Sequence, residues 1–371
     1  MLAVNPDNVL HYLAERRLMT VESAVDGDFM VLDQSSRNRN LKVLRRRSPG
    51  FFLKQARYRN PAYLRTLERE AACYGLAARH PELAGLAGLM PRLHHYDAAN
   101  GLLVLEMLPN AETLWEHHLR AGGFPLAIAE LQGERLGAFQ RQAERFQPQL
   151  EALELFDRQV PWILSIHQTH PQYLSQMSQG NAQLLQILQQ YPEFTAALDA
   201  IRRAWAPRML VHGDVKWENL ILCRAGEETP LELRMIDWEM ADLGDECWDV
   251  GAIVQAYFTF WIFMLPLGPG VSLEQAAATS TYRAEDMQAA LAAFWKSYAR
   301  ARVISGRAER RLLERTMASA AARMIQTAYE AIQQSQQMTP QGLCQLQMSM
   351  NVLHDPAAAA QEIAGLGGAA A

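Results

Sequence analysis

Two short polar motifs within residues 210–251 constrain this chain more than any other part of it. The first reads HGDVKWEN and carries Asp214, Lys216 and Asn219, and the second reads IDWE and carries Asp237. Apolar runs typical of β-strands flank the first motif, and another such run leads into Asp237. We therefore expect short strands that present these polar side chains at their ends.

The residue types in the two motifs suit phosphoryl transfer. Asp214 is the candidate base, because a carboxylate placed between two strands can accept the proton of an acceptor hydroxyl. Asn219 and Asp237 offer the hard oxygen ligands that Mg²⁺ prefers. Lys216 is a candidate to stabilise the charge of the transferring phosphoryl group. We expect Asp249 to accept hydrogen bonds from the backbone of the first motif and to cap the apolar helix that follows.

The N-terminal part of the chain predicts a small α+β lobe. A helical pattern over residues 5–18 precedes it, and short turns between the strand-like runs favour an antiparallel sheet. The expected strands lie at residues 29–32, 41–44, 51–54, 90–94 and 102–107, with a helix at 61–76 between the third and the fourth.

Four residues of this lobe are candidates for nucleotide binding. Lys54 ends the third strand and Glu70 lies in the helix that follows, and protein kinases use such a lysine–glutamate pair at the α- and β-phosphates. Glu68 is an alternative partner, and an exposed lysine at a strand end is the structural alternative for Lys54. Glu106 and Leu108 lie where this lobe passes into the next, so their backbone suits adenine recognition.

Residues after 108 are mainly helical by pattern, apart from the strands beside the two motifs. The run 250–271 has no charged residue and approaches the length of a membrane-spanning helix, but proline and glycine interrupt its last third. We therefore expect a buried core helix. The predicted organisation is an N-terminal nucleotide-binding lobe (1–108), a helical C-terminal lobe that contains the catalytic and metal-binding loops (109–356), and an Ala- and Gly-rich tail (357–371).

These motifs give the chain a family resemblance over most of its length. HGD-x-x-x-x-N followed by IDWE resembles the aminoglycoside phosphotransferase and choline kinase-like family, whereas protein kinases favour H-R-D and D-F-G. The resemblance implies an α+β, bilobal protein kinase-like fold with a small antiparallel-sheet N-lobe and a larger, mainly helical C-lobe. It also implies ATP and Mg²⁺ as cofactors.

Carried over residue by residue, the resemblance makes Asp214 the catalytic base, Asn219 and Asp237 the magnesium ligands, and Lys54 with Glu70 the ion pair. Two features depart from the family. Lys216 is more similar to the catalytic loop of protein kinases, and the polar loop SSRNRN at residues 35–40 is not rich in glycine. The second departure leaves the phosphate contacts unassigned.

Charge and cysteine content bound the partners and the compartment. The net charge of -5 and the pI of about 6.1 argue against nucleic-acid and anionic-membrane partners. The four cysteines form no C-x-x-C pair, so we expect a reducing, cytoplasmic location.

The leading hypothesis is an ATP-dependent phosphotransferase that moves the γ-phosphate to a hydroxyl of a small molecule: an aminoglycoside, an amino alcohol or a sugar-like compound. A peptide or protein Ser/Thr kinase and a non-catalytic nucleotide-binding partner protein are the alternatives. The sequence does not fix the oligomeric state.

Overall fold

The computed structural model describes residues 2–25, 27–35, 37–58, 60–168, 177–268, 270–362 and 366. The chain forms two compact units, each made of two chain segments. Unit 1 contains Met1–Thr113 and Asn219–Ala241, and unit 2 contains Leu114–Glu218 and Asp242–Ala371. The segment Asn219–Ala241, which we expected within a lobe of residues 109–356, packs with unit 1. The reason is a strand pairing described below.

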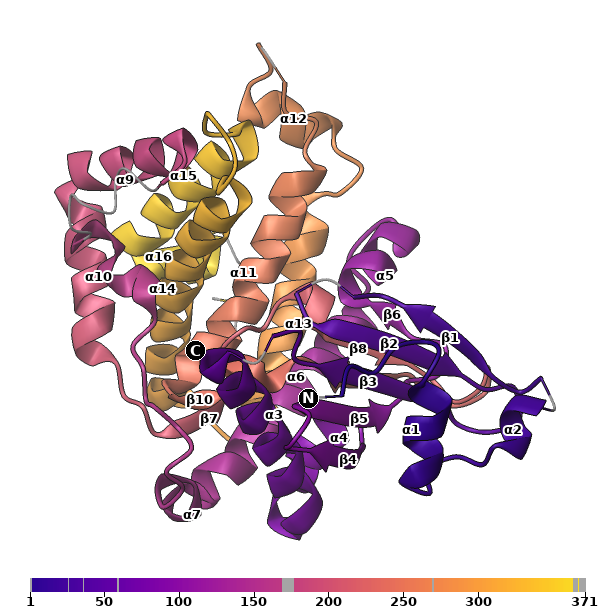
Figure 1. Ribbon diagram of the computed structural model, residues 1–371. Coiled ribbons are helices and arrows are strands. Elements are labelled where there is room, and N and C mark those ends of the chain that lie inside the picture. Colours follow the sequence, from indigo (N-terminus) through magenta and orange to yellow (C-terminus); the bar gives the residue numbers. More distant parts are fainter. Residues whose placement is uncertain are drawn as a thin grey trace. The chain divides into compact units, whose positions relative to one another are not determined.

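Unit 1 is built on an antiparallel five-stranded sheet with the order β1-β2-β3-β5-β4 (Figure 1). Each expected strand is present within a few residues of its predicted position. The fourth strand shows the largest shift: it was expected at residues 90–94, but it begins at Leu93 because an unpredicted helix, α4, ends at Leu89. The strands are β1 (Met30–Asp33), β2 (Arg39–Leu44), β3 (Phe51–Gln55), β4 (Leu93–Asp97) and β5 (Leu102–Glu106), and the helices are α1 (Val9–Glu15), α2 (Glu22–Val25), α3 (Pro61–Arg79), η1 (Pro81–Leu83) and α4 (Ala84–Leu89).

Helix α3 begins at Pro61 for local reasons. The side chain of Asn60 accepts a hydrogen bond from the Ala62 N–H at 2.9 Å, and a proline suits the first turn because it has no N–H to leave unpaired. The helix buries Leu67, Glu70 and neighbouring residues on one face. It therefore directs Glu70 toward the interior of unit 1.

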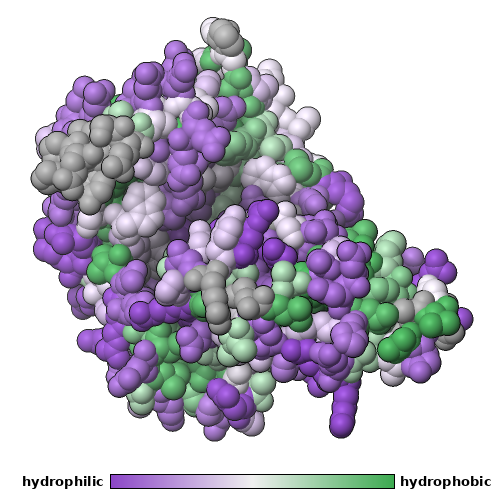
Figure 2. All heavy atoms as spheres, viewed as in Figure 1, coloured by the Kyte–Doolittle hydropathy of each residue, from purple (hydrophilic) through white to green (hydrophobic). Residues whose placement is uncertain are grey.

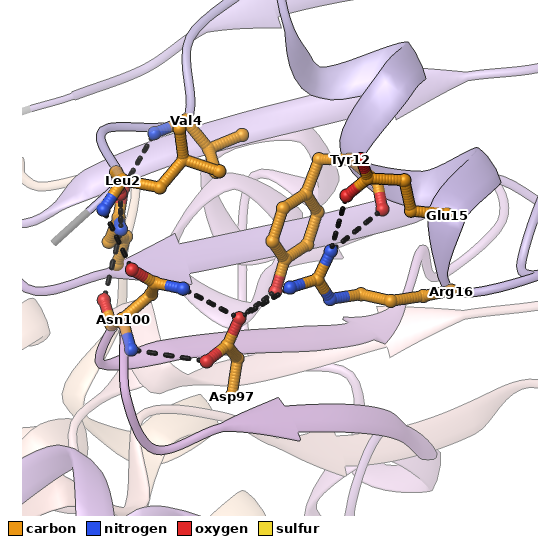
Figure 3. A network of polar contacts seen from close by, with 8 residues as sticks. Leu2, Val4, Tyr12, Glu15, Arg16, Asp97 and Asn100 are labelled. Atoms are coloured by element: carbon orange, nitrogen blue, oxygen red, sulfur yellow. Dashed lines mark hydrogen bonds and ion pairs between the residues drawn. The ribbon is translucent and has the colours of Figure 1, made fainter.

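Helix α1 is shorter than the predicted span 5–18 and is fixed to the sheet at both its apolar and polar faces. Its residues Val9 and Leu13 belong to one buried cluster with strands β2, β3 and β5. Figure 3 shows the polar side: the Tyr12 hydroxyl donates to Asp97 Oδ2 at 3.0 Å, and Arg16 Nη2 donates to the same oxygen at 2.7 Å. Asn100 Nδ2 also donates to it. This network ties the N-terminal helix to the turn after β4.

The opposite edge of the sheet is strand β1. Figure 2 shows apolar side chains there, over α2 and β1. Val25 and Met30 are among the exposed apolar residues of this edge.

A second, three-stranded sheet explains why Asn219–Ala241 belongs to unit 1. Its order is β6-β8-β9, with β6 (Glu112–Thr113), β8 (Leu220–Cys223) and β9 (Glu232–Met235), and all pairs are antiparallel. The short helix η4 (Trp238–Met240) then packs against α3. Asn219 precedes the first strand of the hairpin β8–β9 and Asp237 follows its second strand, so both residues lie at the open end of the hairpin.

Unit 2 is mainly helical, as expected, with a two-stranded antiparallel sheet of β7 and β10. Its helices α6 and α13 pack closely at Gly133, where there is no room for a side chain. A Cβ added at Gly133 would lie 2.2 Å from the carbonyl oxygen of Phe294. The elements are α5 (Leu114–Ala121), α6 (Leu126–Arg145), α7 (Gln147–Glu151), η2 (Trp162–Gln168), α9 (Gln179–Gln190), α10 (Pro192–Ala204), β7 (Met209–Val211), η3 (Trp217–Asn219), β10 (Asp242–Gly244), α11 (Glu246–Met264), α12 (Leu273–Thr279), α13 (Ala284–Arg302), α14 (Gly306–Ala331), α15 (Pro340–His354) and α16 (Pro356–Glu362).

The apolar run forms helix α11, which lies in the core of unit 2. Among the described residues, α11 is the one helix that is both long enough and apolar enough to cross a membrane. However, 89% of its most apolar 18-residue stretch is buried inside the protein. The predicted buried helix is thus confirmed. Its cap differs from the prediction: Asp245 is the N-cap and accepts from the Cys247 N–H at 3.0 Å, while Asp249 lies within the first turns. Of the predicted tail, residues 363–365 and 367–371 lie outside the described part of the chain.

Candidate active site

A buried lysine surrounded by three carboxylates forms the centre of the candidate site in unit 1. Lys54, on β3, donates from Nζ to Glu70 Oε2 at 2.7 Å and also contacts Asp237 Oδ1. Glu239 Oε2 lies 3.2 Å from the same nitrogen. The predicted pair of Lys54 with Glu70 is therefore present in the structure, and Glu68 does not take its place in this contact.

The charges in this cluster support one another. Burial lowers the pKa of Lys54, but attraction to Glu70, Asp237 and Glu239 outweighs burial, so the pKa is raised overall and the lysine stays protonated. Burial raises the pKa of Glu70, and Lys54 opposes that shift. Oxygen atoms of the three carboxylates lie within 4.8 Å of one another. Such a group of hard oxygen donors fits a Mg²⁺ ion.

The backbone at Asp237 adopts a left-handed conformation, with φ 68° and ψ 53°. This conformation is unusual for a residue with a side chain and often accompanies a functional role. The flanking contacts hold it: the Ile236 N–H donates to the carbonyl oxygen of Asn219 at 3.0 Å, and Trp238 Nε1 donates to Met235 O at 2.8 Å. The hairpin thereby brings Asn219 and Asp237 to the same end.

One cavity of about 340 Å³ contains all six residues predicted to contact nucleotide or metal from unit 1. Its lining combines charged and polar groups with apolar side chains such as Phe52 and Leu105. At the passage out of β5, the Met107 N–H donates to Gly50 O at 3.2 Å. The six residues are Lys54, Glu70, Glu106, Leu108, Asn219 and Asp237.

The HGD loop of unit 2 is held by a buried carboxylate. Asp249 accepts the N–H of His212 at 2.6 Å and the N–H of Gly213 at 3.1 Å, as predicted. The Asp214 N–H donates to His212 Nδ1 at 3.2 Å. His212 and Asp249 are fully buried. The backbone of the loop that carries Asp214 is therefore held by these hydrogen bonds. The carboxylate of Asp214 is partly exposed, and Lys216 Nζ donates to its Oδ2 at 2.8 Å.

A second cavity, of about 320 Å³, lies in unit 2 beside this loop. Asp214 and Lys216 line it together with the indole of Trp115. The remaining lining has both polar and apolar side chains and comes from the loop and from helices α11 and α14: Trp217, Glu218, Gln255, Ala256, Thr259, Arg323, Gln326, Thr327, Glu330 and Ala331.

Three residues of these sites had no assigned role in the sequence. Arg323, on α14, donates from Nη1 to Gly213 O at 3.1 Å and from Nη2 to Val215 O at 3.0 Å, and nothing near it in the chain indicates this contact. Glu239 stands in the IDWE motif two residues after Asp237, and this position was a usable signal. Arg37 pairs with Glu239 at 3.1 Å.

Comparison with known proteins identifies the family. The model of the phosphotransferase enzyme family matches residues 31–290, which is more than half of the chain, and the chain belongs to this family. The protein is therefore a phosphotransferase. The comparison with curated proteins gave no match.

Two solved structures show the same kinase-like fold. The choline kinase from Cryptosporidium parvum Iowa II is 10% identical with a TM-score of 0.52, over 94% of this chain and 95% of that one. The GDP and kanamycin complex of APH(2")-IIia is 12% identical with a TM-score of 0.50, over 93% of this chain and 97% of that one. The predicted fold class is thus confirmed.

Proposed function

We propose that the protein transfers the γ-phosphate of ATP to a hydroxyl group of a small molecule. The observation that carries this proposal is Lys54 held by Glu70, Asp237 and Glu239 in the lining of a cavity of about 340 Å³. A protonated lysine beside a metal-binding carboxylate is what a magnesium–nucleotide complex requires, because the lysine contacts phosphate and Asp237 binds the metal, while Glu70 keeps the lysine in place.

In this proposal each residue of unit 1 has a defined task. Asn219 and Asp237 would hold Mg²⁺, which would neutralise charge on the phosphates. Lys54 keeps its bond to Glu70 and contacts the phosphates. The backbone of Glu106 and Leu108 binds the adenine.

Unit 2 supplies the acceptor side. Asp214 accepts the proton of the attacking hydroxyl, and Asp249 and Arg323 keep the loop that carries it in one conformation. Lys216 steadies charge on the transferred group. Asp214 and Asn219 belong to a single motif, so the chain itself links the two tasks. A cytoplasmic location, with access to ATP, is part of this proposal.

The cavity beside Asp214 supports a small acceptor over a peptide. Its volume, about 320 Å³, falls at the low end of the range typical of small-ligand sites. The carboxylates of Glu218 and Glu330 and the ring of Trp115 suit a cationic nitrogen, while Thr259 and Gln255 suit hydroxyl groups. We therefore favour an amino alcohol or an amino sugar, including aminoglycosides.

An acceptor screen read by mass spectrometry tests this function. The panel pairs each amino alcohol or amino sugar with a neutral polyol of equal size, and adds aminoglycosides and serine- and threonine-containing peptides. Phosphate added to the amino compounds supports the proposal. Phosphate on peptides alone favours a protein kinase. Bound Mg-ATP with no turnover on any acceptor favours a non-catalytic nucleotide-binding protein.

A further inference from the structure

The loop between β1 and β2 bears on the phosphate contacts of the unit 1 cavity. Kinases of this fold class commonly cover the phosphates with a glycine-rich loop whose backbone N–H groups face the ligand. Here residues 35–40 contain no glycine. Their side chains use the loop's own N–H groups: the Ser35 N–H donates to Asp33 Oδ1 at 2.8 Å, and the Asn40 N–H donates to Ser35 Oγ at 3.2 Å. These N–H groups are engaged within the loop.

Side chains of the same loop and strand line the cavity instead. Asn38, Asn40 and Lys42 face it, as alternate residues on one face of a strand do, and Arg37 lies next to them. Arg39, one position out of phase, is absent from the cavity lining. Arg37, which precedes β2, thus lines the cavity, whereas Arg39 does not.

Arg37 contacts the cluster around Lys54 directly. Its Nη1 lies 3.1 Å from Glu239 Oε1, while the other oxygen of Glu239 faces Lys54 Nζ at 3.2 Å. The carboxylate of Glu239 is 8% exposed and the side chain of Arg37 is 55% exposed. The guanidinium also lies over the ring of Tyr63, 5.2 Å from its centroid. The carboxylate of Glu239 thus bridges Arg37 and Lys54, two of the cationic residues that line the cavity.

We infer that Arg37 binds the phosphates of the nucleotide beyond the first, and that Glu239 is the partner it leaves when they bind. This inference rests on the proposed function, since it concerns the same cavity. A guanidinium offers paired N–H donors that match phosphate oxygens, so it replaces the contacts that a glycine-rich backbone gives elsewhere. The side chain of Arg37 is mostly exposed, so it has room to turn from Glu239 toward the phosphates.

Binding of adenosine, AMP, Mg-ADP and Mg-ATP by isothermal titration calorimetry tests this inference. Arg37→Ala is expected to weaken Mg-ATP and Mg-ADP binding by about tenfold to a hundredfold, the range for a lost charge-assisted contact, and to leave adenosine and AMP unchanged. Arg39→Ala is the matched control and is expected to bind all four ligands as the wild type does.

Two results would overturn the inference: unchanged affinity of Arg37→Ala for every ligand, or equal weakening for all four, which would indicate a structural role. If the wild-type protein binds none of the four, the proposed nucleotide function itself fails. This failure can be told apart from the two results for Arg37→Ala, because each of those requires that the wild-type protein binds nucleotide.

Magnesium-free ATP gives a second, independent readout. Glu239→Gln removes the competing carboxylate, so ATP affinity without Mg²⁺ is expected to rise several-fold, because fewer molecules hold Arg37 in its alternative pair. In the Arg37→Ala background the same change should give a smaller rise, since only the contact of Glu239 with Lys54 is then altered. An equal rise in both backgrounds would contradict the exchange between Glu239 and phosphate.

Discussion

Replacing Asp249 by asparagine tests how the HGD loop is held. Asp249 is fully buried, and its two oxygens accept the N–H groups of His212 and Gly213 at 2.6 and 3.1 Å. An asparagine of the same shape has one acceptor oxygen, so its NH₂ group must face the other backbone N–H. One hydrogen bond to a charged acceptor is lost, which costs about 1.5–3 kcal/mol, and a buried donor stays unpaired.

The removal of a buried charge offsets part of this loss, because burial raises the pKa of Asp249 and so disfavours its ionised form. We therefore expect Asp249→Asn to lower the free energy of unfolding by about 2–4 kcal/mol, which corresponds to roughly 2–4 °C in Tm per kcal/mol for a unit of this size.

Thermal and urea denaturation followed by circular dichroism measure this change. Asp286→Asn is the control, since Asp286 is exposed on α13, and its effect should stay near 0.5 kcal/mol or less. Asp249→Asn should also lose turnover while keeping its affinity for Mg-ATP, because the HGD loop that it disturbs lies in unit 2. An unfolding free energy equal to that of the wild type would refute the assignment of Asp249 as the support of the loop.

Two further predictions concern the two units separately. Gly133→Ala is expected to destabilise unit 2 by about 1–3 kcal/mol, because the added Cβ would lie 2.2 Å from Phe294 O. Gly123→Ala is the control, because a Cβ added there would meet no atom within 4 Å. Equal Tm values for the two variants would contradict this account. Burial raises the pKa of Asp97, but hydrogen bonds from Asn100, Tyr12 and Arg16 outweigh it and lower the pKa overall, so the stability that the carboxylate contributes is present above its unfolded pKa of about 3.9 and is lost as the pH falls below that value. Asp97→Asn should therefore flatten the loss of stability as the pH falls below about 4 in acid titrations, and a slope equal to that of the wild type would contradict this account.

The parts of the fold that follow from local pattern were predicted from the sequence. The five strands of the first sheet were predicted because alternation and short turns are local signals. The pairing of Lys54 with Glu70 followed from the resemblance to kinases. The support of the HGD loop by Asp249 was also predicted, although Asp249 lies 37 residues after His212.

Other features depend on contacts that the local sequence does not encode. The grouping of Asn219–Ala241 with unit 1 depends on the pairing of β6 with β8, a contact between distant segments. The bonds from Arg323 to the HGD loop likewise span more than a hundred residues. The cap of α11 was misassigned to Asp249 because Asp245 and Asp249 both stand near its start, and only the backbone geometry distinguishes them.

The central claim is that Asp214 is the base of a phosphoryl transfer from ATP. The measurement that tests it most directly is the rate of ATP-dependent phosphorylation of an accepted small molecule by the wild type and by Asp214→Asn, alongside the affinity of both for Mg-ATP. Loss of the base is expected to lower kcat by about 10²–10⁴. Mg-ATP affinity should remain unchanged, because Asp214 is not among the residues that line the unit 1 cavity. An Asp214→Asn variant that phosphorylates the acceptor at the wild-type rate would contradict the claim.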